Sequence, residues 1–267
     1  MEDIKVNLKE KYGEWGIVLG ATEGVGAATA KKIAEGGMNV ILVGRREEKL
    51  NALGEDIKAE YGVEYKVIRA DFSEDNCTDK IFEETKDLDM GFMSYVACLH
   101  RFGKLHETSW EWHQKMLNVN IVTFLKCFIH YMEIFTKQKR GAVVNYSSLT
   151  GITGSPYNAQ YGAGKAYIAK LTEGVAYESR KDVDVMVATL GSTITPSWLS
   201  NQPGGEEGEA ARKRAMTTDD VVDEIFENLG KVRSLVVGET NRASVRHWHT
   251  DMTADEAAEY MGKFYEQ

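Results

Sequence analysis

Short apolar runs alternate with longer amphipathic segments along most of the chain. The runs are rich in Val and Ile and end at Gly or a polar residue, as buried strands do; they cover 15–20, 39–44, 65–70, 91–97, 141–147, 183–191 and 234–238. Apolar residues with helical spacing lie between them, over roughly 24–36, 46–60, 75–86, 110–137, 158–180 and 218–230. This alternation predicts an α/β fold, a doubly wound parallel sheet of about seven strands with helices on both faces.

The domain organisation follows from what interrupts this pattern. No linker, internal repeat or low-complexity tract stands out, so we expect one domain over residues 1–267. Residues 193–217 are the exception, because they hold two of the three prolines and a Gly pair directly after the sixth run. An insertion at the carboxyl edge of a parallel sheet lies where such folds bind ligands. We interpret it as a substrate lid, with a surface loop as the alternative, and the chain closes with a C-terminal tail of about 240–267.

Composition narrows the class of protein. With 43% hydrophobic and 27% charged residues, the chain is typical of a globular protein. A net charge of -9 argues against a nucleic-acid binder, which must neutralise phosphates. The N-terminus has no signal-peptide pattern, and the longest apolar run, 121–135, is interrupted by Lys126, His130 and Glu133. The three cysteines form no CxxC pair. We therefore expect a cytoplasmic protein with reduced thiols that neither spans a membrane nor binds nucleic acid.

The first strand leads into the glycine-rich segment "GATEGVG". It places Gly20, Gly24 and Gly26 at the start of a helix. Glycines there let the backbone approach a pyrophosphate, while free helix N–H groups stabilise its charge. The segment therefore predicts a Rossmann-type dinucleotide site, although a tight turn without a ligand is the alternative.

The second strand ends at "VGRREEKL". A site that prefers NAD usually has a carboxylate at the position of Gly44, where it binds the ribose 2′-hydroxyl. Here Arg45 and Arg46 follow directly, and two guanidiniums suit a 2′-phosphate. The motif favours NADP(H), with a solvated basic pair at a helix start as the alternative.

Three polar residues further along suit proton transfer. Tyr161 and Lys165 are four residues apart on a predicted helix and so share one face, and Ser148 ends the fifth strand. A nearby ammonium favours the phenolate of a tyrosine and lowers its pKa. Together the three would form a general acid/base for interconverting a carbonyl and an alcohol. Tyr-x-x-x-Lys alone is a weak signal, and its position after this strand strengthens it.

With these pieces the chain resembles the short-chain dehydrogenase/reductase family over nearly its full length. Matching segments are "GATEGVG", "ADF" at 70–72, "NVN" at 118–120 and "LGSTITP" at 190–196, besides the Ser, Tyr and Lys above. The resemblance implies Tyr161 as acid/base, Ser148 orienting the substrate oxygen, Lys165 binding the nicotinamide ribose and Asn120 holding a relay water. It implies no metal and a cofactor site formed by Gly20, Thr22, Gly24, Val25, Gly26, Arg45, Arg46, Asp71, Phe72, Ala97, Tyr161, Lys165, Thr193 and Thr195. The alternatives are a helix-capping role for Asp71 and a hydrogen bond in the core for Asn120.

The fourth strand departs from the family pattern. Where the family often has "NNAG", this chain has Tyr95, Val96, Ala97 and Cys98, and Leu190 replaces the Pro of a usual "PG". A Cys98–His100 nucleophile would be redundant beside an intact Ser–Tyr–Lys set, and a metal site there lacks further ligands in range. We expect Cys98 to pack near the cofactor as a small apolar residue.

A narrower resemblance is to one branch of the family, the 7β-hydroxysteroid dehydrogenases of gut bacteria. "LKEKYGEWG", "LDMGFMSYVACLH", "VNIVTFLKCF", "TPSWLSNQPGG" and "YMGKFY" carry it. It implies NADP(H)-dependent interconversion of a 7-keto bile acid and its 7β-hydroxy form. Action at the 3 or 12 position, another bulky ketone, and a non-catalytic NADP-binding regulator are the alternatives.

Two of the predicted helices bear on assembly. The segments 110–137 and 158–180 carry apolar residues on more than one face. This pattern is compatible with a homodimer or homotetramer built on these helices. Burial within one subunit is the alternative.

Overall fold

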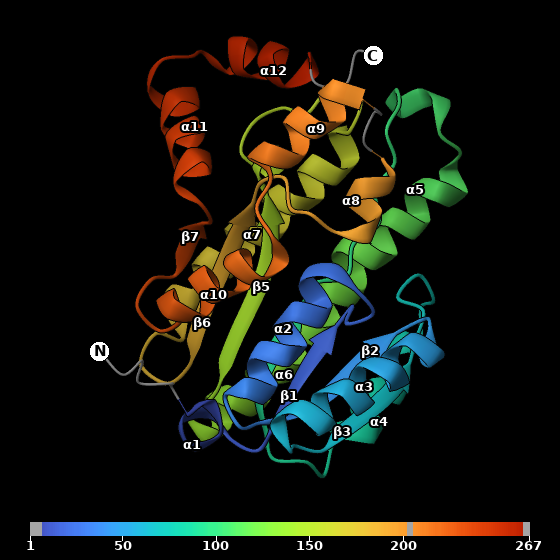
Figure 1. The fold of residues 1–267 in the computed structure, drawn as a ribbon, viewed down its shortest axis with the longest axis vertical. Helices are drawn as coiled ribbons and strands as arrows, with labels where there is room; N and C mark the ends of the chain where they lie inside the picture. The colour runs from blue at the N-terminus through green and yellow to red at the C-terminus, as the bar shows by residue number, and fades with distance from the viewer. Residues whose placement is uncertain (1–6, 202–204, 264–267) are drawn as a thin grey trace.

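Seven parallel strands form one sheet in the order β3-β2-β1-β4-β5-β6-β7 (Figure 1). The computed structural model describes residues 7–201 and 205–263. The strands are β1 Trp15–Leu19, β2 Asn39–Gly44, β3 Tyr65–Arg69, β4 Met90–Tyr95, β5 Ala142–Ser148, β6 Asp184–Leu190 and β7 Ser234–Val236. The winding direction reverses between β1 and β4, where sheets of this kind bind ligands at their carboxyl edge. The predicted doubly wound sheet is confirmed.

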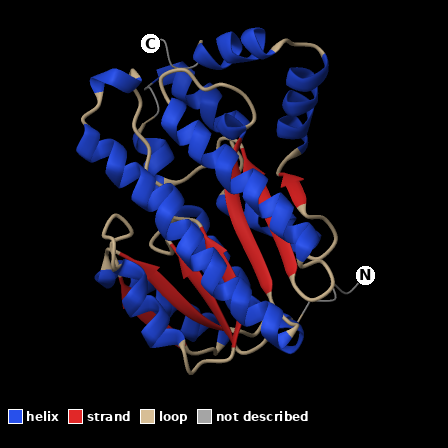
Figure 2. Cartoon of the chain, turned by 180° about the vertical axis from the view of Figure 1, so that it is seen from behind, coloured by secondary structure: helices blue, strands red, loops and turns tan. Residues whose placement is uncertain are grey.

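Helices cover both faces of the sheet. One face carries α2 Gly24–Glu35, α3 Glu47–Tyr61 and α10 Thr218–Asn228; the other, seen in Figure 2, carries α4 Cys77–Thr85, α6 Thr123–Gln138 and α7 Ala159–Glu178. Side chains alternate across β1, so Val18 packs into the first layer and Ile17 and Leu19 into the second. Each such buried side chain contributes about 1.5–3 kcal/mol to folding.

The predicted helix over 110–137 is confirmed, with a local irregularity. It consists of α5 Trp110–Leu117, a π-helical turn η2 at Asn118–Val122, and α6. Such a turn leaves helical carbonyls without their usual partners and is frequent at functional sites. The continuous helix Trp110–Gln138 is long and apolar enough to cross a membrane, and 44% of its most apolar window is buried inside the protein. Core helices of globular proteins share these properties.

Short helices complete the fold where the sequence pattern gave no regular element. They are α1 Leu8–Tyr12, η1 Leu105–Glu107, η3 Leu149–Gly151, α8 Pro196–Ser200, α9 Gly205–Arg214, α11 Glu239–Thr250 and α12 Ala254–Gly262. The predicted insertion thus contains α8 and α9, and the predicted tail forms α11 and α12. Residues 202–204 and 264–267 of these two segments lie outside the described residues. All four helices gather at the upper end of the molecule in Figure 1.

Candidate active site

The glycine turn between β1 and α2 is closely approached by two other segments. Gly20 has φ 103°, and a Cβ there would lie 2.6 Å from the backbone nitrogen of Ala97 after β4. Gly24 has φ 60°, and a Cβ there would lie 2.8 Å from Cγ2 of Thr195. Gly26 is packed against the carbonyl oxygen of Gly20. The turn therefore requires glycine, and it exposes the free N–H groups at the start of α2 to the switch point of the sheet.

The two predicted arginines differ in their surroundings. Arg46 pairs with Glu23 at 2.8 Å. Arg45 lines a cavity and forms no ion pair within residues 7–201 and 205–263. A Cβ on Gly44 would lie 2.7 Å from Oγ1 of Thr22. The end of β2 thus has little room for a carboxylate side chain and presents one free guanidinium.

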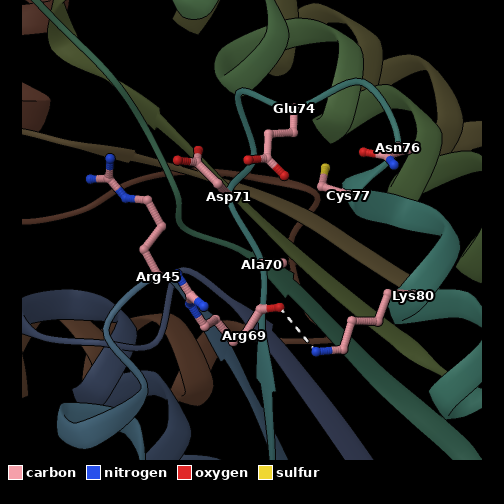
Figure 3. A pocket seen from close by; sticks show the side chains of 8 residues that line it. All are labelled: Arg45, Arg69, Ala70, Asp71, Glu74, Asn76, Cys77 and Lys80. Atoms are coloured by element: carbon pink, nitrogen blue, oxygen red, sulfur yellow. Dashed lines mark hydrogen bonds between the residues drawn. The ribbon is translucent and has the colours of Figure 1, made fainter.

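This cavity has a volume of about 410 Å³ and opens beside the ends of β2 and β3 (Figure 3). It is lined by Arg45, Arg69, Ala70, Asp71, Glu74, Asn76, Cys77 and Lys80. In Figure 3, the Arg45 side chain extends toward Asp71 and away from Arg69, and α4 contributes Cys77 and Lys80. Arg69 pairs with Gly44 across the parallel strands, a position that our sequence analysis did not connect to the site. The lining of the cavity carries three cationic and two anionic side chains, and it does not include Ser148 or Tyr161.

Asp71 and Phe72 have structural roles at the edge of this cavity. The backbone N–H and hydroxyl of Ser73 donate to Oδ1 of Asp71 at 3.0 and 2.8 Å. Burial acts to raise the pKa of Asp71, but the Ser73 hydrogen bonds and the charge of Arg45 outweigh it and hold the pKa below its ordinary value. The Phe72 side chain is buried in the core, 5.8 Å from the Tyr95 ring. Only the backbone of Phe72 is therefore placed to contact an adenine.

Close packing of α7 on β5 brings the catalytic candidates together. The Ser147 hydroxyl donates to the carbonyl of Lys165 at 2.8 Å, and a Cβ on Gly151 would lie 2.8 Å from the nitrogen of Ala166. The Lys165 ammonium donates to the carbonyl of Tyr146 at 2.8 Å and lies 5.6 Å from the centre of the Tyr161 ring. Burial lowers the pKa of Lys165, and the neighbouring Cys98 opposes this shift.

Ser148 marks the end of β5. Its Oγ accepts hydrogen bonds from the hydroxyl of Thr150 at 3.0 Å and from the backbone N–H of Thr150 at 3.3 Å. Both bonds fix the position of Oγ, and they leave its own proton available for a substrate oxygen. The serine is thus preorganised at the carboxyl edge of the sheet.

Asn120 lies in the π-helical turn, and its side chain forms hydrogen bonds with the backbone that follows β4. Its Oδ1 accepts from the N–H of Leu99 at 2.8 Å, and its Nδ2 donates to the carbonyl of Leu99 at 2.7 Å. The Asn120 side chain therefore joins the π turn to the segment that follows β4. A relay water, predicted from the family resemblance, would have to use the backbone carbonyl of Asn120, because both polar atoms of the side chain are bonded to Leu99.

The expectation that Cys98 packs near the cofactor as a small apolar residue stays a prediction. Cys98 is solvent-exposed, whereas Cys77 and Cys127 are buried. Desolvation by surrounding protein acts to raise the pKa of the Cys98 thiol, but a hydrogen bond from His100 and the charge of Lys165 outweigh it and lower the pKa below its ordinary value. The thiol thus faces the same space as the catalytic candidates.

Thr193 and Thr195 stand at the base of the insertion. Thr193 pairs with Met216 in an isolated bridge, so the two ends of the insertion are joined. Thr195 caps α8, its Oγ1 accepting from the N–H of Trp198 at 3.0 Å, and its methyl group faces Gly24 as described above. The structure therefore places the insertion directly over the glycine turn.

The C-terminal helices cover the segment that follows Ser148. Trp248 and Met261 form a small core with Leu149 and Ile152. A Cβ on Gly154 would lie 3.2 Å from the Ala258 side chain. The tail is thus packed against the segment that follows Ser148. Among the described residues, no group of three or more His, Cys, Asp or Glu side chains could hold a metal ion.

Comparison with known proteins identifies the class. The family model of short chain dehydrogenases matches residues 14–204. A 7beta-hydroxysteroid dehydrogenase of Mediterraneibacter gnavus is 60% identical over 98% of this chain and 100% of that protein. A second enzyme of that name, from Collinsella aerofaciens, is 61% identical over 97% of this chain and 99% of that protein. The chain belongs to the short-chain dehydrogenase family, whose members are oxidoreductases.

The fold agrees with this assignment. A structure solved in a study of 7beta-hydroxysteroid dehydrogenase stereoselectivity superposes with a TM-score of 0.93 and 61% identity. The superposition covers 96% of this chain and 99% of the solved chain. The match therefore extends beyond residue 204, where the family model ends, into the C-terminal helices.

Proposed function

We propose that the protein is an NADP(H)-dependent 7β-hydroxysteroid dehydrogenase, which interconverts a 7-keto bile acid and its 7β-hydroxy form. The observation that carries the proposal is the 60% identity, over nearly the whole chain, to enzymes of that name. The Ser148, Tyr161 and Lys165 positions support it, because α7 and β5 bring all three to one edge of the sheet.

In this reaction the chain supplies the proton and the geometry. The bound nicotinamide, when present, supplies or accepts the hydride at the carbon of the substrate carbonyl. Tyr161 donates its phenolic proton to the carbonyl oxygen, while the Ser148 hydroxyl donates a hydrogen bond to the same oxygen. These preorganised donors stabilise the charge that develops on the oxygen. Oxidation of the alcohol uses the same groups in reverse.

Lys165 and Asn120 would return the proton to Tyr161. The ammonium of Lys165 lies near the Tyr161 ring and favours the phenolate form. A water held at the Asn120 carbonyl would link Lys165 to solvent. Binding of the nicotinamide ribose by Lys165 would require its ammonium to leave or share the carbonyl of Tyr146.

The positive charge at the end of β2 supports NADP(H) rather than NAD(H) as the cofactor. Gly44 takes the place of the usual carboxylate, and Arg45 lines the cavity together with Arg69. A 2′-phosphate there would be bound by charge-assisted hydrogen bonds. Arg46 would contribute less to binding the 2′-phosphate, because its charge is already neutralised by Glu23.

The substrate would be enclosed by the insertion and the tail. Residues 193–217 act as the lid in this proposal, joined at their base by the Thr193–Met216 bridge. The helices α11 and α12 form the opposite wall through the Trp248 core. We regard both as parts of one domain spanning residues 1–267.

For assembly, we propose a homodimer or homotetramer that buries one face of α6 and α7. Ile129 and Tyr167 support this, because their side chains are large, apolar and exposed on these helices. Light scattering of the purified protein tests it, and a monomer at micromolar concentration would contradict it.

Turnover assays test the proposed function. NADPH oxidation is measured with 3-, 7- and 12-keto bile acids, and the configuration of each product is determined. We expect 7β-alcohol from the 7-keto acid only; turnover at another position with none at position 7 would refute the substrate assignment. Tyr161→Phe should lower kcat by about 10²–10⁴-fold with NADPH binding retained, whereas Tyr167→Phe on the same helix should not.

A further inference from the structure

His100, which follows β4, lies directly against the catalytic tyrosine. The rings of His100 and Tyr161 are 5.6 Å apart between centroids and inclined at 63°, an edge-to-face contact. His100 also meets Phe102, with centroids 5.3 Å apart and an inclination of 65°. The three rings thus form a chain of edge-on contacts that ends at Tyr161.

The backbone around His100 is fixed on both sides. Before it, Leu99 is held through its N–H and its carbonyl by the side-chain amide of Asn120. After it, the N–H of Gly103 donates to the carbonyl of Tyr157 at 2.8 Å. Five residues are therefore tied at one end to the π turn and at the other to the segment that leads into α7.

A further connection joins the same loop to the first turn of α7. The His113 ring contacts the carbonyl of Leu105 at 3.0 Å and the side-chain oxygen of Gln160. The Gln160 amide in turn donates to the carbonyl of His113 at 3.0 Å. Because Gln160 immediately precedes Tyr161, these contacts link the loop to the start of α7 next to the catalytic tyrosine.

We propose that His100 is a positioning residue for Tyr161. Its ring limits the orientations of the Tyr161 ring, so the phenolic oxygen stays where a substrate carbonyl arrives. Proton transfer depends steeply on this placement. The titratable groups around this contact are Cys98, Lys165 and Tyr161 itself, and the proposal assigns none of the proton transfer to His100. It rests on the proposed function only in that Tyr161 is the proton donor.

Three variants test this role. His100→Ala removes the ring, His100→Phe keeps an aromatic ring without an ionisable group, and His106→Ala alters an exposed histidine of the same loop. We expect His100→Ala to lower kcat about tenfold with KM for the ketone and NADPH affinity changed less than threefold. His100→Phe should recover kcat to within about threefold of wild type with an unchanged pH profile, and His106→Ala should match wild type.

Two kinetic outcomes would overturn the proposal. One is wild-type kcat in His100→Ala. The other is an equal loss of kcat in His100→Phe, which would mean that the imidazole and not the packing is needed. The rates are measured on whichever keto bile acid the wild type reduces, so a wrong assignment of position 7 does not affect the result. Crystal structures of both variants provide a measurement that needs no substrate. The Tyr161 ring should be displaced in His100→Ala and retained in His100→Phe; an undisplaced ring in His100→Ala would also contradict the role.

Discussion

The two arginines after β2 allow the NADP(H) preference to be tested one side chain at a time. Arg45 lines the cavity and has no ion-pair partner within the described ranges, 7–201 and 205–263. Arg46 is half-exposed and already paired with Glu23. The Glu23 carboxylate also forms an ion pair with Lys49 at 3.4 Å. Replacing each arginine by Ala should therefore have unequal effects.

The expected magnitudes follow from these surroundings. A hydrogen bond to a charged group contributes about 1.5–3 kcal/mol, so Arg45→Ala should lower kcat/KM for NADPH by about 10- to 150-fold. An exposed ion pair contributes about 0–1 kcal/mol, so Arg46→Ala should lower it by at most about fivefold. NADH has no 2′-phosphate, and its kcat/KM should change less than threefold in either variant.

The assay is initial-rate reduction of one ketone with each cofactor, at two ionic strengths. The NADPH advantage of the wild type should shrink with added salt, because charge attraction at a partly exposed site is screened. Equal losses with NADPH and NADH in Arg45→Ala would refute the 2′-phosphate interpretation. A larger loss of kcat/KM for NADPH in Arg46→Ala than in Arg45→Ala would refute the proposed difference between the two arginines.

Three further predictions concern packing and reactivity. Gly151→Ala should lower kcat at least tenfold and reduce the melting temperature, since its Cβ would meet the α7 backbone near Lys165; unchanged kcat would contradict this. Iodoacetamide should label Cys98 before the other two thiols at neutral pH, because its lowered pKa increases the thiolate fraction there, and peptide mass spectrometry should detect the order. Trp248→Ala should cost about 3–5 kcal/mol of local stability and raise KM for the ketone with NADPH affinity unchanged, whereas exposed Trp110→Ala should do neither.

The sheet and its main helices could be predicted because each is specified locally. A buried parallel strand such as β2 needs only a continuous apolar run, and an amphipathic helix such as α3 needs only periodic spacing. Short helices depend on capping instead. Thr253 and Glu256 form a capping box at α12, and Thr195 with Pro196 starts α8. These signals were present in the sequence, but they do not stand out in a pattern of hydrophobic positions.

The residues of the candidate site also differ in whether the sequence alone could predict them. Ser148, Tyr161 and Lys165 could be proposed from their spacing, because the end of β5 and one face of α7 determine where they lie. The partner of Arg46 and the cavity position of Arg69 could not, since each depends on a contact between segments distant in the sequence. Their relation to the cofactor site becomes visible only when neighbouring strand ends are placed side by side.

The departure from the usual "NNAG" has a structural counterpart. Tyr95, in the first position of that motif, is fully buried, and its hydroxyl donates to the carbonyl of Val119 at 2.6 Å. That carbonyl lies in the π turn, which needs partners for its backbone. Together with the two Asn120–Leu99 bonds, three hydrogen bonds join the end of β4 to this turn. Because the same loop continues to His100, an altered strand end and an irregular helix together hold the ring that contacts Tyr161.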